Sequence, residues 1–267
     1  MKLSIVLSAQ SASFTAMAYQ GQLESNLKKI KKLGFDGVEL AIRNPATLNL
    51  TELELLLNQN GLPVSAIGTG QVYGEDGMYF THQDRKIRQA AIDRISSHLD
   101  LAEKWGAVVI IGLIRGRSHP EVEKSEAEEW LLEALRICAT QHEKVKLAIE
   151  PINRYETDLL NTVEECLHFL NKLKRNNVGL LLDSFHMNIE EPSITRSLEN
   201  ARKQLFHVHV ADSNRWYPGA GHIDFSSIIR TLEKINYEGY ISGEILPLPD
   251  ADSSARNMIE YMKKIIS

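Results

Sequence analysis

The chain has few cysteines: Cys138 and Cys166 are the only two in 267 residues, and both fall within helix-like patterns. They resemble buried core residues, so we expect no disulfide and favour a reducing, cytoplasmic location. No apolar run reaches the roughly 18 residues that a transmembrane helix needs. The apolar stretch that follows Lys2 is too short for a signal-peptide core and is expected to form a strand.

Positive charge is not in excess either. Thirty Lys and Arg residues against 35 Asp and Glu residues give a formal net charge of −5. Such a chain has no general electrostatic attraction to nucleic acid or to an anionic membrane, so neither is expected as a partner. The chain also lacks a Pro-, Gly- or Ser-rich linker. We therefore expect one domain, residues 1–267.

Strand-like and helix-like segments alternate along the whole chain. Strands are expected at 2–7, 36–40, 63–67, 107–113, 145–150, 178–183, 205–210 and 240–244. Helices are expected near 22–33, 51–59, 84–105, 122–142, 161–174, 193–203, 225–235 and 251–265. Eight such pairs predict an α/β fold, a single (β/α)8 TIM barrel rather than a doubly wound sheet. Left-handed residues that end helices are expected at Gly34, Gly61, Gly106 and Gly239.

Four of the expected strands end in an acidic or imidazole side chain. The runs VKLAIE, VGLLLD, LFHVHV and YISGE place these residues at Glu150, Asp183, His209 and Glu244. In a parallel barrel the C-terminal strand ends converge on one mouth, where active sites are built. Each residue alone could be a helix cap or half of an ion pair, but the shared position favours a site. Three carboxylates and one imidazole predict one divalent metal ion, with Mn²⁺ favoured and Mg²⁺, Co²⁺ or Zn²⁺ as alternatives.

Several other features fall at the same mouth. The longest irregular connections are expected at 68–83, 114–121, 184–192 and 211–224, and all of them follow strands. His207 faces the same side as His209, deeper in the barrel, and is expected to be a hydrogen-bonded core residue or a support for His209. Glu39, at the end of the second strand, either reaches the pocket or caps the next turn.

Glu150 and Glu244 lie on different strands, about a third of the circumference apart. A substrate held between them would present one face to each carboxylate. This arrangement suits the removal of a proton beside a carbonyl on one face and its return on the other, through a metal-bound cis-enediolate. Both residues are therefore candidate catalytic groups as well as metal ligands.

Three stretches resemble a known family: EPINRYE (150–156), LLDSFHMNIEE (181–191) and HVHVADSNRWYPGAGHIDF (207–225). Together with Glu244 they resemble the ketose 3-epimerases, the D-tagatose/D-psicose 3-epimerase group of the xylose-isomerase-like TIM barrels. GTGQVY (68–73), IIGLIRGR (110–117) and EILPLP (244–249) are most similar to 5-keto-L-gluconate epimerases. The resemblance implies a sugar epimerase that inverts C3 of a ketohexose or a keto-hexonate or uronate. The preferred interpretation is a 5-keto-L-gluconate/D-tagaturonate epimerase.

The resemblance also implies roles for single residues. It makes Glu150 and Glu244 the acid–base pair. It also makes Glu150, Asp183, His209 and Glu244 the ligands of one Mn²⁺-type ion. His186 and Arg215 would hold the O1–O2 end of the sugar, with Glu156 beside that end. Relatives of this kind are often dimers or tetramers, so a homo-oligomer is expected.

Arg115 and Arg117, just after the fourth strand, are not shared with the neutral-sugar members of the group. An arginine fork binds a carboxylate in bidentate fashion. One of the two is therefore expected to meet a substrate carboxylate, although one or both could instead pair with Glu121, Glu123 or another loop acid.

Other interpretations stay open. The same site could act on neutral D-tagatose, D-fructose or D-psicose, or serve as an aldose–ketose or hydroxypyruvate-type isomerase that uses one base. An endonuclease IV-like enzyme would need a multi-zinc cluster and a DNA-binding face, which this acidic chain does not supply. A non-catalytic sugar-binding barrel would have no need of two candidate bases.

Overall fold

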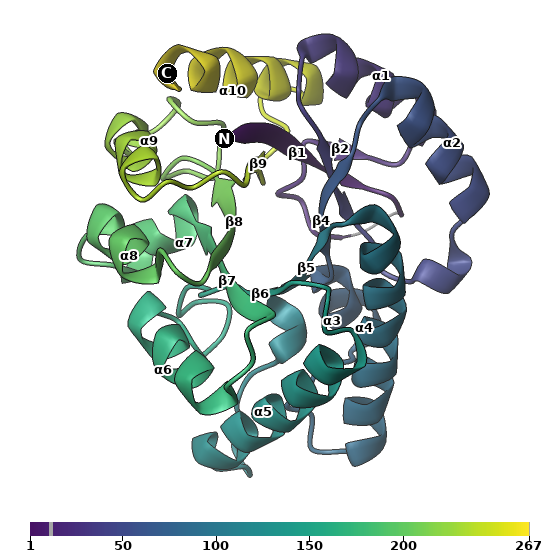
Figure 1. Cartoon of the computed structure of the whole chain (residues 1–267), viewed down its shortest axis with the longest axis vertical. Coiled ribbons are helices and arrows are strands. Elements are labelled where there is room, and N and C mark those ends of the chain that lie inside the picture. Colours follow the sequence, from purple (N-terminus) through teal and green to yellow (C-terminus); the bar gives the residue numbers. More distant parts are fainter. Residues whose placement is uncertain (11–12, 267) are drawn as a thin grey trace.

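Eight parallel strands close into a barrel in this computed structural model, which describes residues 1–10 and 13–266 (Figure 1). In barrel order they are β1 (Lys2–Ser8), β3 (Val38–Ala41), β4 (Val64–Gly68), β5 (Val108–Ile111), β6 (Leu147–Ile149), β7 (Val178–Asp183), β8 (Leu205–Val210) and β9 (Tyr240–Gly243). Pairing of β1 with β9 closes the ring. A short strand, β2 (Tyr19–Gln20), pairs with the end of β1. The predicted TIM barrel is confirmed.

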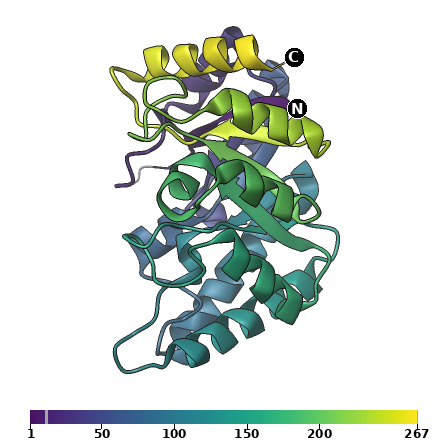
Figure 2. The ribbon, with the colours of Figure 1, turned by 90° about the vertical axis from the view of Figure 1, so that its left-hand side faces the viewer.

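An outer ring of helices covers the strands (Figures 1 and 2). Its members are α1 (Leu23–Leu33), α2 (Leu50–Asn60), α4 (Arg85–Trp105), α5 (Lys124–Gln141), α6 (Val163–Leu173), α8 (Ile194–Ala201), α9 (Phe225–Lys234) and α10 (Ala251–Ile265). Local chemistry sets their ends. Thr162 and Glu165 form a capping box at the start of α6, and Asp224 accepts a hydrogen bond from the amide of Ser227 in α9.

The glycine expectations are confirmed at Gly34, Gly61 and Gly106, which end α1, α2 and α4 in the left-handed conformation. The expectation for Gly239 is wrong. Asn236, with φ 57°, takes the left-handed position after α9 instead, since asparagine also tolerates that region.

Two segments expected to be irregular contain short helices. The connection 68–83 includes α3 (Gly70–Asp76), and 184–192 includes α7 (Ser184–Glu190). Single 3₁₀ turns, η1 (Pro45–Thr47) and η2 (Leu113–Arg115), follow β3 and β5. Helices of seven residues are too short to show an apolar period, which is why the sequence pattern missed them.

Successive side chains along each strand point to opposite faces of the sheet, which produces two apolar cores. One set of side chains packs outward against the helices, and a smaller cluster inside the barrel consists of Ala66, Ile110, Ala148 and Leu181. Ala148 and Leu181 lie two residues before Glu150 and Asp183, so the same alternation turns those two carboxylates inward at the C-terminal mouth. Cys138 and Cys166 are buried free thiols. Across the described residues, no helix has both the length and the apolar character to cross a membrane.

Candidate metal and acid–base site

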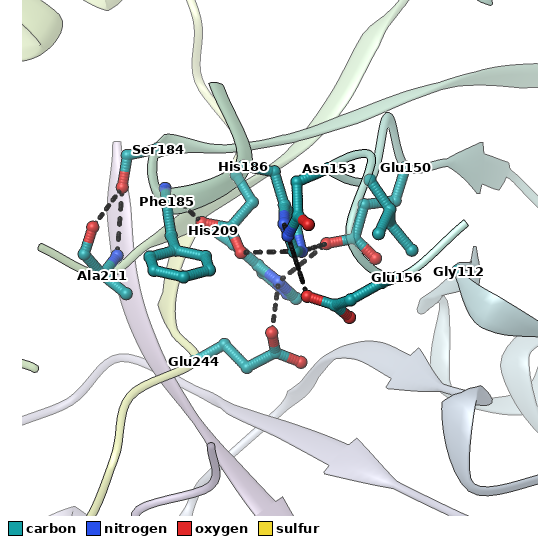
Figure 3. Close-up of polar contacts among 12 residues, drawn as sticks. Gly112, Glu150, Asn153, Glu156, Ser184, Phe185, His186, His209, Ala211 and Glu244 are labelled. Atoms are coloured by element: carbon teal, nitrogen blue, oxygen red, sulfur yellow. Dashed lines mark hydrogen bonds and ion pairs between the residues drawn. The ribbon is translucent and has the colours of Figure 1, made fainter. Parts of the chain in front are cut away.

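The four strand-end residues converge at the mouth of the barrel. One ligand atom from each of Glu150, Asp183, His209 and Glu244 lies within 4.8 Å of all the others. In Figure 3 the side chains of Glu150 and Glu244 both point toward the imidazole of His209. His209 Nδ1 is 3.9 Å from Glu150 Oε1 and 3.8 Å from Glu244 Oε2. The structure therefore brings together all four predicted ligands.

Strand register explains this convergence. Asp183 at the end of β7 pairs with His209 of β8, and His209 pairs with Ser242 of β9, two residues before Glu244. Glu150 follows the last residue of β6 directly. Gly112 allows the close approach on this side, because a Cβ there would come within 2.9 Å of Glu150 Oε2. The mouth is thus built by neighbouring strands in one register.

The donor set fits a divalent cation. Glu150 Oε1 and His209 Nδ1 are buried and have no hydrogen-bond partner among the described residues, a costly state for polar atoms. Burial, together with the neighbouring charge of Glu244, raises the pKa of Glu150 to about 8. Burial also raises the pKa of Glu244, to about 7. A cation at the centre of the four would pair with both unpartnered atoms and relieve the repulsion.

The surplus of negative charge also acts on the imidazole. Burial alone would lower the pKa of His209, but the charges of Glu39, Glu244 and Glu150 outweigh burial and raise it to about 10. The site therefore draws in positive charge, either a proton or a metal ion.

Arg215 joins two of the carboxylates. Its guanidinium donates to Asp183 Oδ2 at 2.7 Å and to Glu244 Oε2, and it lies over the ring of Phe185. Burial alone would raise the pKa of Asp183, but the charge of Arg215 outweighs it and holds the pKa low. Arg215 has φ 64°, a backbone conformation that is uncommon outside glycine and often found at functional sites. The predicted sugar-binding arginine thus lies within the site, bound to two of its carboxylates.

The loop that carries Arg215 is held by Asp212. The Asp212 carboxylate accepts hydrogen bonds from the amides of Ser213, Gly219 and Ile223. Ser184, the first residue of α7 directly after β7, donates through Oγ to the carbonyl of Ala211 and accepts from its amide (Figure 3). These bonds tie the ends of β7 and β8 together and fix the path of the chain toward Arg215.

His186 and Glu156 meet through a residue that the sequence reasoning missed. Asn153 Nδ2 donates to His186 Nδ1 and to Glu156 Oε1, each at 2.8 Å (Figure 3). Burial lowers the pKa of His186 to about 3, so the ring is neutral. Because Nδ1 accepts from Asn153, the proton sits on Nε2, 3.7 Å from Glu150 Oε1. His186 therefore presents a hydrogen-bond donor to the site.

A cavity of about 270 Å³ opens beside this cluster. Its lining includes six of the predicted site residues: Glu150, Glu156, His186, His209, Arg215 and Glu244. Helix α3, which the sequence pattern did not indicate, contributes Gln71 and Tyr73 to the lining. Phe14 and Met17 supply apolar surface. The volume lies near the lower end for ligand pockets, about 300 Å³, and suits a small molecule.

Arg115 is not brought to this cavity. The side chain is fully buried, and its guanidinium donates to the backbone carbonyls of Gly112, Glu150, Leu159 and Leu160. Four of its five N–H groups therefore already have acceptors. This placement does not match the expectation that Arg115 meets a substrate carboxylate.

Arg117 lies on the surface. Its exposed side chain donates to the carbonyl of Glu156 at 3.3 Å, and it is not among the residues that line the cavity. Neither arginine forms an ion pair with Glu121 or Glu123 within the described part of the chain, so the alternative pairing is not seen either.

Comparison with known proteins defines the class. The family model for the xylose isomerase-like TIM barrel matches residues 27–265, and the chain belongs to this family. Within it, the chain is a sugar epimerase of the ketose 3-epimerase group with a candidate metal site.

Individual relatives narrow the group. The chain is 30% identical to a D-psicose 3-epimerase of Ruminiclostridium cellulolyticum over 80% of this chain and 75% of that one. A ketose 3-epimerase of Arthrobacter globiformis is 27% identical over 80% and 74% of the two chains. The structure of a D-allulose 3-epimerase from Methylomonas sp. in complex with D-allulose superposes with a TM-score of 0.84, at 25% identity, over 98% and 97% of the chains.

Metal loading should depend on the sole nitrogen of the set. We expect His209→Ala to lower the Mn²⁺ bound per chain, measured by elemental analysis after gel filtration. The exposed His168 on α6 offers a control, and His168→Ala should bind metal as the wild type does. Chelation should abolish turnover, and added Mn²⁺ or Co²⁺ should restore it. Full activity in protein shown to be metal-free would contradict the assignment.

Arg115 should matter for stability. Arg115→Met removes the donor for several buried carbonyls, and each unsatisfied group costs about 1–3 kcal/mol. We expect the free energy of unfolding, measured with urea, to fall by about 3 kcal/mol or more. Arg117→Met, at an exposed position, should change it by less than about 0.5 kcal/mol. A free energy of unfolding that Arg115→Met lowers as little as Arg117→Met does would show that Arg115 has no structural role.

Proposed function

We propose that this protein inverts the carbon next to the ketone, C3, of a free and uncharged ketose. The observation that carries the proposal is the pair of carboxylates of buried Glu150 and half-buried Glu244, which approach one imidazole from different strands and line the same cavity. Relatives with the names ketose 3-epimerase, L-ribulose 3-epimerase and D-psicose 3-epimerase match most of the chain.

In this proposal each glutamate serves one face of the sugar. One carboxylate removes the proton from C3, and the other returns a proton from the opposite side. Burial raises both pKa values toward neutrality in the cation-free site, and the charge of a bound cation would lower them again. Which glutamate acts first depends on which epimer is bound.

Other residues hold the substrate and stabilise developing charge. The Nε2–H of His186 and the guanidinium of Arg215 are suited to the oxygens at the ketone end, where negative charge grows as the proton leaves. Glu150, Asp183, His209 and Glu244 would hold a divalent cation, which supplies Lewis-acid polarisation of the carbonyl when it is bound. Asn153 keeps His186 in the donor tautomer and orients Glu156 beside it.

The charge of the cavity favours a neutral sugar over a keto-acid. Among the described residues that line it, Arg215 is the only arginine or lysine, and it is already paired with Asp183 and Glu244. Glu75 and Glu156 also line the cavity and would repel a carboxylate. With Arg115 occupied by backbone carbonyls, the main support for 5-keto-L-gluconate or D-tagaturonate as substrate is lost. A neutral ketose, such as D-tagatose, D-fructose or D-psicose, is the better proposal.

The two-base mechanism predicts opposite behaviour for two variants. Glu150→Gln and Glu244→Gln should each slow inversion at C3 by about 10²-fold or more. In D₂O, however, each variant should still exchange the C3 proton of one epimer without inverting it, because one base remains. The two variants should exchange opposite epimers, as followed by NMR of each purified ketose.

Two other outcomes of this experiment, and one outcome of a kinetic comparison, would contradict the proposal. Exchange of the same epimer by both variants would indicate a single base. Deuterium at C1 with an aldose product would indicate an isomerase. A higher kcat/KM for 5-keto-L-gluconate or D-tagaturonate than for the neutral ketoses, measured with Mn²⁺ present, would restore the keto-acid interpretation.

A further inference from the structure

Glu39 lies between two histidines inside the barrel. Its Oε2 is 2.9 Å from His207 Nε2, and both of its oxygens are 3.0 Å from His209 Nε2. All three side chains are about 1% exposed, so water does not compete for these bonds. Glu39 comes from β3, and the histidines come from β8 across the barrel. This buried trio, Glu39, His207 and His209, is directly joined to the candidate metal site through His209.

The contact with Glu39 decides which nitrogen of His209 is free. An ionised carboxylate can only accept hydrogen bonds, so His209 Nε2 must carry the proton that it shares with Glu39. The lone pair of the metal-binding tautomer is then on Nδ1. That atom is the buried nitrogen without a hydrogen-bond partner among the described residues, and it faces Glu150 and Glu244.

The trio could itself be read as a second metal site, because its three ligand atoms also lie close together. The distances argue against this. Each imidazole nitrogen contacts the carboxylate directly at 2.9–3.0 Å, the length of a hydrogen bond. A zinc ion would instead lie about 2.0–2.2 Å from each ligand atom, between them. Shared protons, rather than a second cation, account for the trio.

We propose that Glu39 is a positioning residue that fixes the ring orientation and tautomer of His209 for the metal ion, with His207 holding Glu39 in place. The inference rests on the proposed metal site and adds a residue that does not touch the ion. Ligating histidines commonly donate their second N–H to a carboxylate, and loss of that partner typically costs about 10–100-fold in metal affinity.

The test is the Mn²⁺ affinity of Glu39→Gln, measured from the EPR signal of free Mn²⁺. Both carboxylate oxygens contact His209 Nε2, so in either orientation the amide introduced by Glu39→Gln turns its NH₂ group toward that nitrogen and opposes the donor form of His209. We expect the Kd for Mn²⁺ to rise by about tenfold or more.

The matched control is His98→Gln. His98 is equally buried and hydrogen-bonds to the backbone carbonyls of Ile42 and Arg94, outside the site. This variant loses buried hydrogen bonds in the same way, and its Kd should stay within about twofold of the wild type. An equal rise in both variants would mean that lost stability, not positioning, weakens the site, and would overturn the inference.

The remaining outcomes separate the inference from the proposed function. If wild-type protein binds no Mn²⁺, the metal site itself is wrong. If wild type binds Mn²⁺ and folded Glu39→Gln binds it within twofold, the site stands and the inference fails. If Glu39→Gln does not fold, the inference is tested instead on the wild-type protein, loaded with Co²⁺ and labelled with ¹⁵N-histidine, by NMR. One hyperfine-shifted, slowly exchanging Nε2–H signal is expected, and its absence would overturn the inference.

Discussion

The site depends on one electrostatic constraint, the crowding of three carboxylates, two of them buried and Glu244 half-buried, around a single imidazole. Arg215 neutralises part of this charge through Asp183 and Glu244, but Glu150 Oε1 has no partner among the described residues. The raised pKa values of Glu150 and Glu244 follow from the same crowding. A divalent cation would satisfy the cluster, and the two glutamates at its edge are the groups proposed to move protons.

Because the carboxylates repel one another, the surrounding fold must hold them in place. Three strands deliver the side chains in register, and Asp183 is fixed further because its Oδ1 caps α7 through the amide of Phe185. Behind Glu150, Arg115 binds the backbone carbonyl of that same residue. Asp212 and its amide donors organise the loop that carries Arg215. The polar network around the mouth therefore serves to place charge, while the apolar core outside the strands supplies most of the stability.

The sequence predicted the barrel and the convergence of four strand-end residues, because both depend on local patterns. Each buried strand is an apolar run, and the polar residue that ends it is visible by position alone. Asn153 and Glu39 were not assigned because their partners are distant, 33 residues away for His186 and 170 for His209. Arg115 was misplaced for a related reason: spacing puts it just beyond a strand end, but cannot show that buried carbonyls from residues 159 and 160 receive its side chain.

The most direct measurement is anomalous diffraction from crystals of the wild-type protein grown with Mn²⁺. A single peak should appear at the barrel mouth, within coordination distance of Glu150, Asp183, His209 and Glu244, with Nδ1 as the ligand atom of His209. No peak at these four strand ends, or a peak between Glu39 and His207 instead, would contradict the account.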